Sequence, residues 1–232
     1  MQLHPRDHHA ARHRAARSPT QKKSLIATER DEAARTVWRA TITVLPVADL
    51  VFLDETSTQT TMTRNRGRAP CGQRLHAAIP RNHGPTVPCI AALTLAGIRP
   101  SLAFVGALDG PLFAQWVDDH LVPMVRPGQI VILDNLSVHK NADARRAIEA
   151  AGCQLRVLPA YSPDVNPIGV AFSNLKAHLR GAGVRTVEAL ITEMGSGLNA
   201  MTSTIAASLP PNGLHLIPDE ESGITLMCKH DR

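Results

Sequence analysis

Apolar positions along this chain fall into two patterns, which predict strands and helices in alternation. Unbroken apolar runs predict buried strands at residues 47–53, 89–96, 102–105, 129–133 and 154–158. Apolar residues at helical spacing predict helices at residues 24–41, 111–125, 141–151, 167–180 and 186–201. Because the later strands alternate with helices, we expect an α/β fold with a mixed sheet and helices on its faces.

Local signals mark the ends of several of these elements. Asn166 and Pro167 resemble a helix start, with the asparagine side chain as the cap and proline at the first helical position. Gly181 and Gly183 then end that helix. Residue 54 is an aspartate, and we expect it to end the strand at residues 47–53.

The periodic part of the chain is flanked by segments without a clear pattern. Residues 1–23 are rich in His, Arg and Ala and are predicted to be a disordered basic arm. Residues 24–201 are predicted to form one domain. Residues 202–232 contain several prolines and glycines that break any periodicity, so we expect an irregular tail.

The positive charge of the chain is unevenly distributed. The net charge is +5, and residues 1–23 carry six Lys or Arg and one acid, so the rest is neutral with 19 basic and 19 acidic residues. Within that neutral part, the stretch from Thr56 to Leu108 has no acid and six arginines, at positions 64, 66, 68, 74, 81 and 99. Such a segment indicates a local surface for a polyanion, whereas solvated loop arginines are the alternative.

Composition excludes several classes of protein. The four cysteines are scattered without a Cys-x-x-Cys pair, which supports neither a zinc site nor a disulfide framework. No apolar stretch approaches the roughly 18–20 residues that span a bilayer, and the N-terminus lacks the apolar core of a secretory signal. We therefore expect a cytoplasmic protein without a membrane partner.

The candidate chemistry lies at two aspartates that follow apolar runs. Asp54 follows Leu50-Val51-Phe52-Leu53, and Asp134 follows Ile130-Val131-Ile132-Leu133. Carboxylates at the ends of adjacent strands suit a two-metal phosphoryl-transfer site, since Mg²⁺ prefers oxygen ligands. A third carboxylate is expected near the start of the helix at residue 167, where the chain has Gly169.

Longer strings around these residues resemble transposases of bacterial insertion sequences related to the mariner superfamily. They are Leu53-Asp54-Glu55-Thr56, Arg66-Gly67-Arg68-Ala69-Pro70-x-Gly72-Gln73-Arg74, Asp134-Asn135-Leu136-x-x-His139-Lys140 and Leu158-Pro159-x-Tyr161-Ser162-Pro163-Asp164-x-Asn166-Pro167-Ile168. The resemblance runs from about Lys22 to Met201. It implies a ribonuclease-H-like fold in which a metal-bound acid triad cuts DNA and joins the freed 3′-OH to a target.

Carried onto this chain, the resemblance makes Asp54 the first acid and Asp134 the second, both binding Mg²⁺ or Mn²⁺. The third acid of the family directly follows Asn-Pro-Ile, and here 34 residues separate Asp134 from Gly169 at that position. The spacing fits the family, but the ligand is missing. Asp164 is the candidate substitute, although it lies in the loop before the helix. We expect weakened or absent cleavage and a weakened metal site.

The resemblance also implies DNA as the partner, both the element ends and the target, and a homodimer or a mixed oligomer with intact transposase. The predicted phosphate contacts are Arg64, Arg66, Arg68, Arg74, Lys176 and Arg180. The helix-turn-helix domains usual in the family are not expected in 23 residues, and together with the altered end and the lost acid this indicates a decayed copy. Three functions stay open: a transposase catalytic domain, a noncatalytic DNA-binding relic that interferes with intact copies, and a nuclease that uses Asp164.

Overall fold

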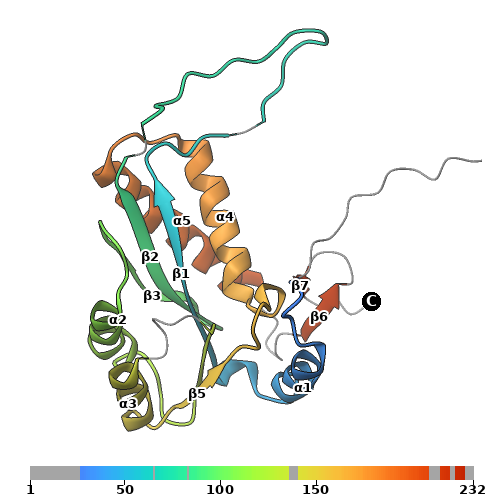
Figure 1. Ribbon diagram of the computed structural model, residues 1–232, viewed down its shortest axis with the longest axis vertical. Helices are drawn as coiled ribbons and strands as arrows, with labels where there is room; N and C mark the ends of the chain where they lie inside the picture. The colour runs from blue at the N-terminus through green and yellow to red at the C-terminus, as the bar shows by residue number, and fades with distance from the viewer. Residues whose placement is uncertain are drawn as a thin grey trace, which may run out of the picture.

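The computed structural model describes residues 27–64, 66–82, 84–135, 141–208, 215–219 and 223–227, with side chains as far as residue 201. The predicted basic arm, residues 1–23, lies outside the described residues. Figure 1 shows a central sheet with α4 and α5 on one side and α2 and α3 on the other. The helices are α1 (Glu32–Ile42), α2 (Gly110–Trp116), α3 (Ala142–Ala150), α4 (Pro167–Ala182) and α5 (Val187–Ser208).

The sheet has five strands in the order β3-β2-β1-β4-β5. The strands are β1 (Leu50–Gln59), β2 (Thr86–Thr94), β3 (Gly97–Ala103), β4 (Ile130–Leu133) and β5 (Gln154–Val157). The first three form an antiparallel meander, while β4 pairs parallel with both β1 and β5. The predicted mixed sheet is confirmed, and parallel pairing is possible because helices make the crossovers between β3, β4 and β5.

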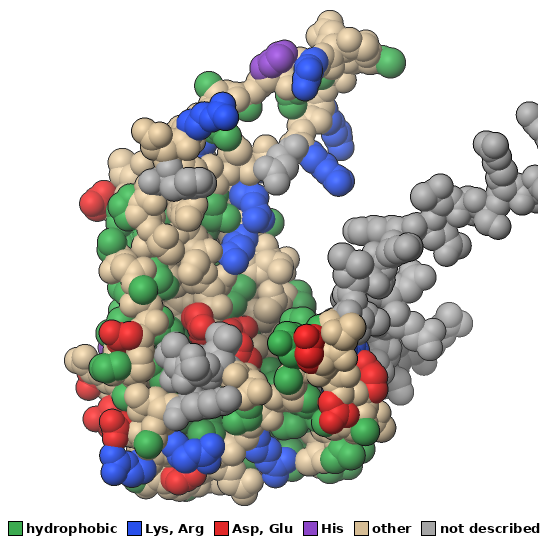
Figure 2. Space-filling model, in the orientation of Figure 1, with side chains coloured by type: hydrophobic (Ala, Val, Ile, Leu, Met, Phe, Trp, Pro, Cys, Tyr) green, Lys and Arg blue, Asp and Glu red, His purple; other side chains and the backbone are tan. Residues whose placement is uncertain are grey.

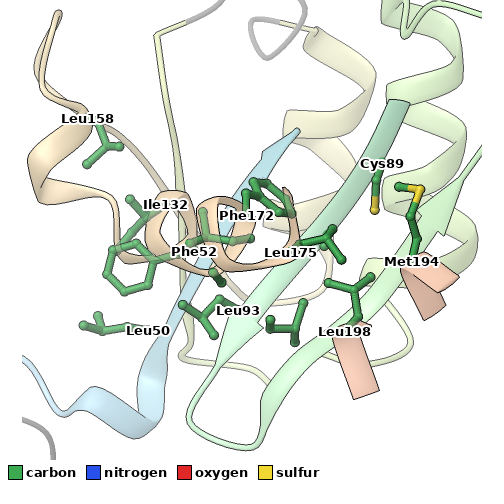
Figure 3. Packing of buried hydrophobic residues seen from close by; sticks show 14 of the residues in the cluster. Leu50, Phe52, Cys89, Leu93, Ile132, Leu158, Phe172, Leu175, Met194 and Leu198 are labelled. Atoms are coloured by element: carbon green, nitrogen blue, oxygen red, sulfur yellow. The ribbon is translucent and has the colours of Figure 1, made fainter. Parts of the chain in front are cut away.

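Alternation along β1 and β4 divides the core into two layers. Leu50, Phe52 and Ile132 face α4 and α5, where they pack with Phe172 and Leu175 of α4. Figure 3 shows these side chains together with Met194 and Leu198 of α5. The residues of opposite parity pack against α2 and α3 on the other face and include Val51, Leu53, Val131 and Leu133. The period of two along a strand thus places even-numbered residues of β1 and β4 under α4.

Strand β1 is longer than predicted, and the expectation that Asp54 ends it is wrong. Residues 47–49 form a short 3₁₀ turn, and the strand begins at Leu50 and runs to Gln59. It continues because β2 pairs with it along this length, from Phe52 opposite Leu93 to Gln59 opposite Thr86. Buried Thr58 is tolerated there since its hydroxyl donates to the carbonyl of Val87 at 2.9 Å.

The helices agree with the predicted ones to within a few residues at most ends. The predicted helix at 111–125 is α2 followed by a π-helical turn, Val117–Leu121. Helix α4 ends at Ala182, and Gly183 takes the left-handed conformation at φ 62° that favours glycine. Helix α1 begins later than predicted, at Glu32, where Asp31 accepts a hydrogen bond from the backbone N–H of Ala34.

The C-terminal part differs from the predicted irregular tail. Helix α5 continues to Ser208, and the two short strands β6 (His215–Asp219) and β7 (Gly223–Met227) pair as an antiparallel hairpin. No helix within the described part of the chain is long and apolar enough to cross a membrane.

The layer beneath α4 gives a direct test of this packing. Leu175 is fully buried among side chains from β1, α4 and α5. We predict that Leu175→Ala lowers the free energy of unfolding by about 2–5 kcal/mol, because it removes buried methyl groups and leaves a cavity. Urea titration measures this value. The exposed neighbour Val170 is the control, and a loss for Val170→Ala as large as that for Leu175→Ala would contradict the described packing.

Candidate active site

Asp54 and Asp134 line one pocket of about 410 Å³ at the start of α4. The strand register explains why. Leu50 pairs with Ile130 and Phe52 with Ile132 across the parallel strands β1 and β4. Two residues further along, Asp54 and Asp134 therefore lie at the same level on the face that α4 covers. Residues 80 apart in sequence are in this way brought to one pocket by strand pairing.

Asn166 lies in the same pocket and binds Asp54. Its amide Nδ2 donates to one carboxylate oxygen of Asp54 at 3.0 Å, while the backbone N–H of Glu55 donates to the other at 2.8 Å. The expected side-chain cap of α4 by Asn166 is therefore wrong. Asn166 stands at the cap position, but its side chain makes no capping hydrogen bond. A capping asparagine would accept a backbone N–H with its Oδ1. Here the side chain is turned so that Nδ2 reaches the charged oxygen of Asp54, and Oδ1 is buried without a hydrogen-bond partner among the described residues.

Gly169 also lines this pocket, as the third residue of α4. A Cβ built at this glycine meets nothing within 4 Å. A Cβ at position 169 thus meets open space, at the border of the pocket that Asp54 and Asp134 also line. Among the described residues, no group of three or more His, Cys, Asp or Glu is placed to hold a metal ion.

Asp164, the proposed substitute, faces α1 instead. Arg35 of α1 binds both of its carboxylate oxygens, one of them at 2.9 Å, and Arg39 and Arg30 lie 3.3 and 3.9 Å away. Asp164 is not among the residues that line the pocket. Hydrogen bonds from Arg35 lower the pKa of the Asp164 carboxyl below its ordinary value, with the charges of Arg35 and Arg30 adding to the effect while burial opposes it.

The donor set in the pocket suits one hard divalent cation. Asp54 and Asp134 supply carboxylate oxygens, which Mg²⁺ and Mn²⁺ accept as ligands. Asn135 also lines the pocket, whereas His139 and Lys140 of the predicted motif lie outside the described residues. The pocket lining thus supplies two carboxylates, and position 169 supplies none.

A long loop between β1 and β2 carries the predicted DNA-binding arginines. Arg64, Arg66, Arg68 and Arg74 are exposed there. Figure 1 shows the loop extending from the end of the sheet, and Figure 2 shows arginine side chains along it. Arg185 fixes the base of the loop by donating to the carbonyls of Thr60 and Met62 at 3.0 and 2.9 Å.

Helix α4 connects this loop to the acid pocket. The guanidinium of Arg64 lies against Gly181 near the end of the helix, where a Cβ would come within 2.7 Å of it. Lys176 and Arg180 are half-buried, at positions 7 and 11 residues after Gly169. Those intervals bring a helical residue back to the same face. By helical spacing Lys176 and Arg180 thus share a face of α4 with Gly169, and Arg64 lies at the far end of the same helix.

The fold and the positions of the two aspartates define the class of protein. A five-stranded sheet in the order β3-β2-β1-β4-β5, with one acid in β1 and one directly after β4, is the ribonuclease-H-like arrangement. The chain belongs to the DDE superfamily endonucleases, a family that matches residues 49–191.

Solved structures of Mos1 mariner transposase share the fold. Its paired-end complex with Mg superposes with a TM-score of 0.61 at 16% identity, covering 84% of this chain and 64% of the other. Its paired-end complex with the left transposon end gives 0.59 at 14%, covering 83% and 67%. Its strand transfer complex gives 0.57 at 16%, covering 83% and 66%. This chain thus spans about two thirds of the Mos1 chains. No curated protein sequence matches it.

Sequence reasoning does not identify the roles of two residues, Asn166 in the pocket and Arg35 beside Asp164. Asn166 was assigned to the helix cap, and the Asn-Pro pair carries no sign that its amide binds a strand residue 112 positions earlier. Arg35 lies in a helix with many charges, so its complete burial beside Asp164 is invisible without the tertiary contact. A sequence signal for this pair would have been covariation, which one sequence cannot provide.

The ion pairs of Asp164 make a prediction for the pH dependence of stability. The folded carboxyl has a pKa below the ordinary 3.8, so its contribution is complete above that value and is lost as the pH falls through the lower folded pKa. We expect Asp164→Asn to reduce the free energy of unfolding at neutral pH, and the difference from wild type to shrink as the pH falls below 3.8.

Urea titrations of both proteins over that pH range test the expectation. Asp143→Asn is the matched control, because the Asp143 side chain is 67% exposed and pairs only with a neighbour on its own helix among the described residues. A deficit for Asp164→Asn that stays constant into acid would contradict the role given to the charged carboxylate.

Proposed function

We propose that this chain is the catalytic domain of an insertion-sequence transposase whose metal-dependent cleavage and strand transfer of DNA are impaired by the loss of the third acid. The observation that carries the proposal is the pocket where Asp54, Asp134 and Gly169 meet. Two of the three positions expected of a DDE triad keep their acid, and the third has a glycine in open space.

In this proposal Asp54 and Asp134 hold Mg²⁺ or Mn²⁺, and Asn166 orients Asp54 through its amide. The bound cation would neutralise charge on the phosphate oxygens during cleavage. Lys176, Arg180 and the loop arginines contact the phosphodiester backbone and guide it along α4. Asp164 serves as a structural partner of Arg35 and does not replace the missing acid, since its oxygens are already engaged by arginines.

Restoring the third acid is the sharpest test. We predict that Gly169→Glu raises Mg²⁺- or Mn²⁺-dependent cleavage of terminal-repeat DNA by about 100-fold, because even a misplacement of about 1 Å can cost that much. Cleavage of a labelled duplex in single-turnover conditions measures the rate, and joining of the cut ends to a second duplex reports strand transfer.

Gly169→Gln is the matched control, because it has nearly the same size and helix propensity without the carboxylate. It should remain as slow as wild type. Cleavage by the wild type at the rate of the Gly169→Glu variant would refute the impairment. An equal gain for Gly169→Gln would show that filling the space or stabilising α4, rather than supplying a ligand, is responsible.

A second function is favoured by the exposed arginine loop, which is present although the acid triad is incomplete. The chain would then hold DNA without cutting it and interfere with intact transposase, either by occupying element ends or by forming mixed oligomers. This second function needs DNA affinity in the absence of metal, which the first does not require.

The loop arginines predict how that affinity depends on salt. Replacing Arg66, Arg68 and Arg74 together by Gln should reduce the slope of log K against log salt by about 0.9 for each phosphate that is no longer neutralised, or about 2–3 in total. Fluorescence anisotropy with a labelled duplex and no divalent metal measures the slope. Arg145→Gln with Arg146→Gln is the control, since both arginines pair with acids of their own helix. An unchanged slope in the loop variant would remove these residues from the DNA interface.

A further inference from the structure

Helix α1 precedes the part of the chain that matches the family, yet it contacts the pocket through a short series of side chains. We propose that α1 completes the active site: Arg35 and Asn166 are positioning residues that together fix the carboxylate of Asp54 for a cation. The inference rests on the proposed function of Asp54 as a metal ligand. It assigns a role to residues outside the acid triad.

The first connection joins α1 to the loop before α4. Arg35 is completely buried, and its guanidinium binds both oxygens of Asp164 and one oxygen of Glu32. A fork that donates to two oxygens of one carboxylate fixes direction as well as distance. Since Asp164 lies in the 3₁₀ turn Pro163–Val165, Arg35 sets the position of that turn against α1.

The second connection joins the same turn to Asp54. Asn166 directly follows the turn and is 6% exposed, and Val165, Pro167 and Ile168 around it are also buried. The turn and the start of α4 are thus packed together against the core. The amide of Asn166 donates to one oxygen of Asp54, while the N–H of Glu55 donates to the other. Both oxygens of Asp54 are therefore oriented by fixed donors.

Orientation of a ligating carboxylate changes its affinity for a metal ion. Partners that hydrogen-bond to a ligating carboxylate determine its geometry, and their loss typically weakens metal binding about 10–100-fold. Asn166 holds Asp54 directly, and Arg35 acts only through Asp164 and the turn. Arg35 thus acts on Asp54 through Asn166, so it changes the affinity for the cation only while the Asn166 amide is present.

A double-mutant cycle on the full chain tests this order. Mn²⁺ binding is followed by the electron paramagnetic resonance signal of the free ion, in the wild type and in the Gly169→Glu background. We expect Asn166→Ala to weaken binding about 10–100-fold. Arg35→Met should weaken it in the same direction, but should cause no further loss once Asn166→Ala is present. The loss in free energy of unfolding caused by Arg35→Met, measured by urea titration, should be the same with Asn166 and with Asn166→Ala.

Three controls keep the result interpretable. Asp54→Asn should abolish the Mn²⁺ binding that the cycle follows. Arg39→Met removes a single 3.3 Å contact to Asp164 from a partly exposed arginine and should change affinity little. Asp164→Asn removes the other member of the Arg35–Asp164 pair. This variant takes the place of Arg35→Met in the cycle if Arg35→Met does not fold.

Each outcome is decisive. Unchanged Mn²⁺ affinity in Asn166→Ala, with a loss in Asp54→Asn, overturns the inference and leaves the proposed function standing. Additive losses from Arg35→Met and Asn166→Ala also overturn it, because Arg35 would then act by another route. No effect of Asp54→Asn contradicts the proposed function itself, and the inference fails with it.

Discussion

The parallel register of β1 on β4 is the constraint on which the pocket depends. It pairs Phe52 with Ile132, and so places Asp54 level with Asp134 on the face beneath α4. A slip of one residue in either strand would turn its aspartate to the opposite face, among the side chains packed against α2 and α3. The apolar residues that alternate between the two core layers prevent such a slip, because it would bring every one of them to the wrong layer.

Packing of α4 on the same face adds the third position. Phe172 and Leu175 anchor the helix over β1, and its first turn then brings residue 169 to the pocket. Glycine at this point leaves the backbone arrangement intact and brings no side chain to the pocket. The core and the strand register therefore fix the backbone around the pocket whichever side chain stands at position 169. The backbone scaffold depends on core residues, whereas the chemistry of the pocket depends on other side chains, so either can change without the other.

The sequence predicts elements well where the period of apolar residues determines them. It predicts poorly the features that depend on contacts with residues distant in sequence. The apolar runs before Asp54 and Asp134 predict buried strands, and β1 and β4 lie there. The sequence spacing also singles out residue 169, which lines the same pocket as the two aspartates. The length of β1 was underestimated because pairing with β2, rather than apolar content, extends it to Gln59. The amide of Asn166 and the burial of Arg35 depend on contacts between residues more than 100 positions apart, which no local pattern encodes.

The central claim is that the pocket is a cation site lacking one ligand, and metal occupancy in crystals tests it most directly. Crystals of the wild type and of Gly169→Glu, soaked in the same Mn²⁺ solution, would be compared by anomalous scattering. The account predicts a strong peak in contact with Asp54, Asp134 and the introduced carboxylate, and a weak or absent peak in the wild type. Equal peaks in both crystals, or a peak away from the two aspartates, would contradict it.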